Sequence, residues 1–274
     1  MTIFEILFPA FVASLILTGI HAYLGVHVVE RGVIFVDLSL AQIAALGTTV
    51  AYLAGFDLHS TTAYLFSLGF TFFGAAIFAM TRMHRRTRIP QEAVIGIVYA
   101  VSAAVAILVM SKATQETEHL KEMLVGNILS VSWPELFKTG VLYALVGFFH
   151  YIFRRKFLMI SMNEAEAERQ GVNIRLWDFL FYMSFGFVVT SSVAIAGVLL
   201  VFCFLIVPSV TAMLFTERLG PRLAIGWTMG VVVSAIGVWL SYLWDLPTGA
   251  TIVGTFGLAL LVIAGYRRAF RRTA

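Results

Sequence analysis

The chain has 274 residues, of which 60% are hydrophobic and only 12% are charged, and its mean hydropathy is +0.91. Soluble domains carry about 25% charged residues, so this composition excludes a soluble globular protein and predicts a polytopic membrane protein. The formal net charge is +4, and the clustering of the basic residues described below favours membrane topology, not nucleic-acid binding, as its cause.

A helix needs about 20 apolar residues to cross the hydrocarbon core of a bilayer. Nine segments qualify, and they lie near 3–24, 33–54, 61–81, 93–110, 136–153, 177–195, 198–216, 223–244 and 248–266. They are solid apolar blocks and do not alternate with polar residues, which favours helices over a transmembrane barrel. We therefore expect an all-α bundle of about 8–9 transmembrane helices, forming one domain over residues 1–274.

The second segment, within residues 31–55, carries two polar side chains, Asp37 and Gln42. An acid placed in hydrocarbon costs at least about 2.5 kcal/mol, and such residues are usually functional or partnered. Asp37 is therefore a candidate site residue, with a buried acid paired to backbone or to Arg31 as the alternative. Gln42 is either a second candidate or a hydrogen-bonding contact between helices.

Basic residues predict the orientation, because Lys and Arg concentrate in short cytoplasmic loops. They gather around Arg31, in 82–88, in 154–175, at 218–222 and in 267–272, whereas the loops 55–60 and 244–247 contain none. With nine spans this pattern places the N-terminus outside and the C-terminus in the cytoplasm.

Motifs for catalysis are missing from the sequence. There is no G-x-x-x-x-G-K-[ST] loop, so the chain cannot hold ATP in the P-loop manner, and there is no H-E-x-x-H zinc motif or G-x-S-x-G elbow. Cys203 is the only cysteine, which excludes a disulfide or a thiolate metal cluster within one chain. We expect this chain not to be an enzyme.

Residues 118–136 are too interrupted to span a membrane and too apolar for an ordinary exterior loop. They predict a re-entrant or interfacial helix, or else a partly buried connecting helix. Pro134 fits the first turn of the helix that follows, where a missing N–H costs nothing.

The most polar run of the chain is 162–177, on the predicted cytoplasmic side. Asn163 can cap a short helix, Glu164 and Glu166 favour its positive N-terminal end, and Gly171 suits its C-terminal end. The run is either a solvated loop or a docking surface for a cytosolic partner.

Pro208 lies inside the apolar stretch 198–216. Proline within a transmembrane helix forfeits a backbone hydrogen bond and usually bends the helix. Ser209 and Thr211 can help to satisfy the freed carbonyls. We expect a kink at Pro208, either as part of a gate or as ordinary helix packing.

Together these stretches resemble the permease family of ABC importers for zinc, manganese and iron. The resemblance runs in order through QEAVIGIVY (91–99), similar to E-x-x-I-G-I; LVGNILSVSWPEL (124–136), similar to L-F-G-x-I-L-x-V-S; the alanine-rich run 162–176; 197–216, similar to G-x-L-L-V … P-x-x-x-A; and LPTGATIV (246–253), similar to P-x-G-A-x-I-V.

The resemblance implies a permease in the bacterial inner (cytoplasmic) membrane that passes a divalent metal ion inward. Its implied partners are a second copy of the permease, a cytosolic ABC ATPase dimer that binds the ATP, and an extracytoplasmic metal-binding protein. No cofactor is expected in this chain. The implied cytosolic coupling region covers about 160–176, and its coupling residues are Asn163, Glu164, Ala165, Glu166, Ala167 and Gly171.

The sequence departs from the family in the second segment, where the family often reads G-D-A-L-S-H-A with Asp and His as metal ligands. Here Asp37 is followed at i+4 by Ala41, and aligning the stretch on Gly47 puts Gln42 at the histidine and Leu38 at the aspartate. Residues five apart on a helix differ by about 140°, so Asp37 and Gln42 do not easily chelate one ion.

The missing histidine weakens the case for zinc, because carboxylate and carbonyl oxygens suit manganese and other hard ions. A two-fold dimer would bring two Asp37 carboxylates together. His21 in the first segment is a further metal candidate, or else a packed polar residue.

Two other function classes remain open on sequence alone. A stand-alone secondary transporter or channel, driven through Asp37, needs no ATPase-docking run at 162–177. A non-transporting membrane scaffold predicts that Asp37→Ala is silent.

Overall fold

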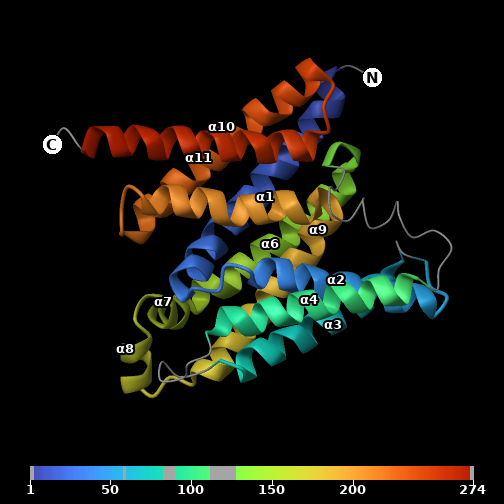
Figure 1. Ribbon diagram of the computed structural model, residues 1–274, viewed down its shortest axis with the longest axis vertical. Helices are drawn as coiled ribbons and strands as arrows, with labels where there is room; N and C mark the ends of the chain where they lie inside the picture. The colour runs from blue at the N-terminus through green and yellow to red at the C-terminus, as the bar shows by residue number, and fades with distance from the viewer. Residues whose placement is uncertain (1–2, 58–59, 83–89, 112–127, 272–274) are drawn as a thin grey trace. The chain divides into compact units, whose positions relative to one another are not determined.

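The computed structural model describes residues 3–57, 60–82, 90–111 and 128–271 (Figure 1). Within these ranges the regular structure is entirely helical, which confirms the predicted all-α class. The elements are α1 (Ile3–Arg31), α2 (Val36–Leu53), α3 (Thr61–Met80), α4 (Gln91–Met110), the short 3₁₀ helix η1 (Ile128–Ser130), α6 (Trp133–Ile152), α7 (Arg154–Met162), α8 (Glu164–Arg169), α9 (Ile174–Met213), α10 (Leu219–Trp244) and α11 (Thr248–Arg271).

Seven of the described helices are long and apolar enough to cross a membrane. The pair α6 and α7, bent by 76°, would make an eighth span. The segments predicted at 177–195 and 198–216 are the two parts of the 40-residue element α9, which meet at the non-helical backbone of Gly197 (φ 74°, ψ 162°). A straight helix of that length would measure about 60 Å, twice the hydrocarbon thickness, so the break falls where the sequence predicts a boundary.

The start of α6 confirms the placement of Pro134 in a first helical turn. The Ser132 hydroxyl donates to the Glu135 carboxylate at 2.7 Å, and the Ser132 backbone N–H donates to it at 2.8 Å. This is the capping arrangement that fixes a helix N-terminus. Most of the predicted re-entrant stretch, 118–127, lies outside the described residues.

The chain forms two compact units, each built from separated stretches of sequence. Unit 1 takes residues 1–29, 124–144 and 195–274, and unit 2 takes residues 30–123 and 145–194. No single cut in the sequence separates them, and one permease domain over 1–274 stays a prediction.

Unit 1 is held by close approach of its helix backbones. A Cβ on Gly25 of α1 would lie 2.0 Å from the Leu205 carbonyl oxygen of α9, so only glycine fits there. The Ser209 hydroxyl lies at the same contact, 3.3 Å from the Ala22 carbonyl oxygen. The helices α10 and α11 also pack against each other.

In unit 2, α2 packs against both α3 and α4, and Figure 1 shows the three helices running side by side. A Cβ on Gly47 would come within 2.8 Å of the Phe66 carbonyl oxygen. The Ser67 hydroxyl of α3 donates to the Ala44 carbonyl at 2.9 Å. These contacts fix α2, which carries Asp37, firmly within the unit.

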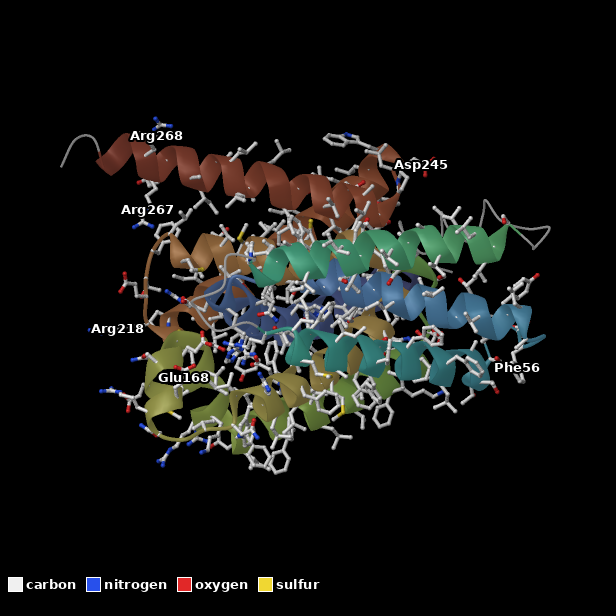
Figure 2. The ribbon with its side chains drawn as sticks, turned by 60° about the horizontal axis from the view of Figure 1, so that its bottom comes forward. Phe56, Glu168, Arg218, Asp245, Arg267 and Arg268 are labelled. Carbon is white, nitrogen blue, oxygen red and sulfur yellow. The ribbon has the colours of Figure 1, made fainter. Side chains whose placement is uncertain are left out.

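Basic and acidic side chains lie at opposite ends of unit 1. Figure 2 places Arg218, Arg267 and Arg268 at one end of unit 1 and Asp245 at the other. The Arg267 guanidinium lies 5.4 Å from the Phe215 ring centroid, which joins the last helix to the loop beside Arg218. In unit 2, Glu168 and Phe56 mark opposite ends (Figure 2).

Candidate functional site

Asp37 lies in the first turn of α2 and is 1% exposed. Its Oδ1 has no hydrogen-bond partner among the described residues. The alternative that Asp37 pairs with Arg31 is wrong, because the Arg31 guanidinium is hydrogen-bonded to Asp178 at 2.7 Å and to the Ser161 hydroxyl at 2.8 Å. A buried carboxylate oxygen left without a partner is costly, which favours a functional reason for it.

Gln42 does not lie on the face of α2 that carries Asp37. It belongs to a half-exposed stripe at i+4 spacing, made of Leu38, Gln42, Leu46 and Val50. Asp37 and Ala41 are instead buried. Leu38 and Gln42 align with the Asp and His pair of the resembling family, and they therefore share a partly accessible face.

His21 is buried in α1, and its Nδ1 donates to the Leu17 carbonyl oxygen at 2.8 Å. Its ring packs against Tyr143, with centroids 6.2 Å apart and an edge-on angle of 71°. These contacts fit the packed polar residue that the sequence left open. Among the described residues no group of three or more His, Cys, Asp or Glu side chains is arranged to hold a metal ion.

The predicted helix in the polar run is α8, Glu164–Arg169. The Asn163 side chain accepts a hydrogen bond from the Glu166 backbone N–H at 3.1 Å, which confirms the predicted cap. At the other end, Gly171 (φ 69°) donates to the Glu168 carbonyl and Val172 donates to the Ala167 carbonyl, each at 3.0 Å. This is a Schellman motif, and it needs a left-handed residue at the position of Gly171.

The two faces of α8 differ. Ala165 and Glu168 are exposed, Glu164 and Glu166 are half-buried, and Ala167 is fully buried. Ala167 packs in a small apolar cluster with Ile160, Val172, Met159, Ile174 and Trp177. Ala167 therefore stabilises the region from inside, and the face free to meet a partner is that of Ala165 and Glu168.

Four charged residues meet beneath α8, and we call them the Asp178 cluster: Arg31, Arg82, Glu164 and Asp178. The carboxylate of Asp178 is completely buried and binds Arg31 through one oxygen and Arg82 through the other. Arg82 also reaches Glu164 at 3.3 Å. Burial lowers the pKa of Arg82, but the charges of Asp178 and Glu164 raise it by more, so its pKa lies above the usual range.

Sequence reasoning missed Asp178 and Arg82 as partners. Asp178 stands at the edge of an apolar segment, where an acid is unusual, but 96 residues separate it from Arg82 and 147 from Arg31. Nothing in the local pattern indicates which of the many basic residues it binds.

The kink expected at Pro208 stays a prediction. The only non-helical backbone within α9 is at Gly197, eleven residues before Pro208. The Ser209 hydroxyl donates to the Leu205 carbonyl at 2.9 Å, as expected for a residue beside proline. Thr211 does not play this part, because its hydroxyl has no hydrogen-bond partner among the described residues.

A search of known families matches residues 3–267 to the ABC 3 transport family. The chain belongs to this family. A manganese transport system membrane protein, MntC, from Listeria innocua is 28% identical over 245 residues, covering 89% of this chain and 84% of the relative. A probable iron transport system membrane protein from Haemophilus influenzae is 30% identical over 252 residues, covering 91% and 89%.

Among solved structures, PsaBC from Streptococcus pneumoniae in complex with Fab has a TM-score of 0.77 with this chain at 23% identity. The alignment covers 95% of this chain and 91% of the other. This chain therefore has the same helical fold as that structure.

Proposed function

We propose that this ABC 3 family member is the permease subunit of an ABC importer that passes a divalent metal ion inward. The observation that carries this proposal is the family match over residues 3–267. Relatives named for manganese and for iron transport align with nearly the whole chain, which supports a metal ion as the substrate. The seven candidate spans support a multi-pass position in the membrane, which we take to be the bacterial inner membrane.

We propose manganese or ferrous iron, in preference to zinc, as the cargo. Asp37 and Gln42 offer oxygen donors, and oxygen suits these harder ions. The described part of one chain has no preassembled cluster of His, Cys, Asp or Glu. An ion on the path is therefore held by few groups at a time, and a second copy of the chain would supply a second Asp37.

The proposed partners follow from the ends of the molecule. We place α8 and the arginine-rich end of each unit in the cytoplasm, by the positive-inside rule. The exposed face of α8 then meets a separate ATPase dimer, and an extracytoplasmic metal-binding protein delivers the ion at the other side. The N-terminus outside and the C-terminus in the cytoplasm belong to the same proposal.

Elemental analysis of cells grown under metal limitation tests the substrate. Deletion of the gene is expected to lower cellular manganese or iron, and the wild-type gene is expected to restore it. Unchanged manganese, iron and zinc after deletion, in cells without a second uptake system, would contradict the proposal.

A further inference from the structure

The Asp178 cluster connects four separate parts of unit 2. Arg31 lies at the end of α1, Arg82 follows α3, Glu164 begins α8, and Asp178 lies in the second turn of α9. The two guanidinium and two carboxylate groups balance in charge. Figure 1 shows the end of α3, the start of α4 and the first turns of α9 on the side of the unit that carries α8.

Burial makes this cluster stiff. The exposed fraction of the side chain is 0% for Asp178, 1% for Arg31 and 11% for Arg82. The Arg31 guanidinium also stacks 3.9 Å above the Phe181 ring centroid. In such surroundings charges interact strongly, and a buried charge separated from its partner is heavily penalised. A displacement of α8 that carries Glu164 is therefore expected to move Arg82 and Asp178 with it.

A second set of contacts continues from the cluster to α2. Tyr182 follows Asp178 by one turn of α9 and is completely buried. The Gln91 amide donates both to the Tyr182 hydroxyl and to the Phe78 carbonyl, each at 3.2 Å. Gln91 begins α4, so this step ties α9 and α3 to α4.

The last step is made by Glu92, the neighbour of Gln91. Its carboxylate accepts a hydrogen bond at 2.8 Å from the backbone N–H of Phe35, the residue that immediately precedes α2. A carboxylate at that place also interacts favourably with the positive end of the helix dipole. Asp37 lies two residues further on, so the contacts run from α8 to the turn that holds the buried acid.

We propose that Asp178 is a positioning residue: through Arg82, Arg31 and the Tyr182–Gln91–Glu92 contacts, it transmits the movement of α8 to the first turn of α2. This inference rests on the proposed function, in which an ATPase moves α8 and the ion passes Asp37. The role of Asp178 is mechanical, because it sets the position of α2 without touching the ion.

The test uses the permease assembled with its ATPase in proteoliposomes, with manganese(II) as the probe and uptake per ATP hydrolysed as the readout. Asp178→Asn is expected to lower this ratio about tenfold, a typical size for coupling between two sites. Gln91→Met, which keeps side-chain length but cannot bond Tyr182 or Phe78, is expected to lower it about fivefold.

Non-additivity separates transmission from general weakening of the fold. Glu164→Gln and Gln91→Met alter opposite ends of one series of contacts, so the double variant should lose no more of the ratio than the worse single variant. Thr71→Val is the matched control, because Thr71 is a buried polar residue of unit 2 bonded to Thr190 at 3.3 Å outside the series. Its uptake per ATP is expected to stay at the wild-type value.

The outcomes are distinct. A wild-type assembly without ATP-dependent uptake overturns the proposed function, and the inference with it. A working wild type together with unchanged ratios in Asp178→Asn and Gln91→Met overturns the inference alone, as do losses in the double variant that multiply. Should Asp178→Asn fail to assemble, Gln91→Met and the double variant decide, because both leave the buried carboxylate in place.

Discussion

At the scale of single residues, the burial of the Asp37 carboxyl group is energetically unfavourable. A buried polar atom without a hydrogen bond costs about 1–3 kcal/mol, and more when it is charged. Asp37 Oδ1 is in that position among the described residues, although asparagine would have nearly the same shape. Unfavourable groups of this kind are retained at sites where activity depends on them.

Asp37→Asn removes a buried carboxylate charge and keeps its shape, so the variant is expected to be at least as stable as the wild type while losing metal uptake. Thermal unfolding in detergent, with and without manganese(II), measures the first effect, and uptake by cells measures the second. Manganese should raise the melting temperature of the wild type and not that of the variant.

Ser39→Ala is the matched control for Asp37→Asn. Ser39 lies in the same turn of α2, is buried, and its hydroxyl also has no hydrogen-bond partner among the described residues, but it carries no charge. Uptake should survive this change. Loss of uptake in Ser39→Ala, or full uptake in Asp37→Asn, would contradict the assignment of Asp37 to the ion path.

Gly25 gives a second prediction at this scale. Gly25→Ala places a methyl group against the backbone of Leu205, which cannot yield without moving α1 from α9. The expected loss of stability is about 1–3 kcal/mol, read as a lower melting temperature. Gly19→Ala, with nothing within 4 Å of the added Cβ in the same helix, should be neutral or slightly stabilising; equal losses in both variants would show that the close contact is not the cause.

At the scale of elements, α8 presents one clear face. Figure 2 shows Glu168 at an end of unit 2, and Glu168 and Ala165 are exposed whereas Glu164 already pairs with Arg82. A partner that docks on α8 meets the first two residues and not the third. Changing Glu164 would therefore disturb the Asp178 cluster and would not probe the docking face.

Glu168→Lys is expected to abolish co-purification of the ATPase while leaving the melting temperature of the permease unchanged, because an exposed side chain contributes little to stability. Asp57→Lys makes the same charge reversal at an exposed acid in the segment beside Phe56, at the opposite end of unit 2 (Figure 2). It should retain the ATPase. Retention in both variants would remove α8 from the docking surface.

Local chemistry made several elements predictable from sequence. Asn163 marks the start of α8 because its side chain caps the first turn. Gly171 marks the end because glycine readily adopts the left-handed backbone of a C-terminal cap. Pro134 likewise marks the start of α6. Long-range contacts were beyond such reasoning, because the pairing of Arg31 with Asp178 spans 147 residues.

At the scale of the whole molecule, unit 1 carries basic and acidic side chains at opposite ends, a separation typical of membrane-spanning helices. The basic residues Arg218, Arg267 and Arg268 lie at one end of unit 1, opposite Asp245 (Figure 2). Each unit is built from separated stretches of sequence. Hydropathy therefore predicts the spans but not which spans pack together in one unit.

The permease of an ABC importer passes its ion only when a separate ATPase drives it. Uptake of manganese(II) into proteoliposomes holding the permease, with and without the ATPase and hydrolysable ATP, measures this directly. We expect uptake only when the ATPase and ATP are both present, and none with the Asp37→Asn variant. Uptake at the same rate without the ATPase, driven by an ion gradient alone, would contradict it and favour a secondary transporter.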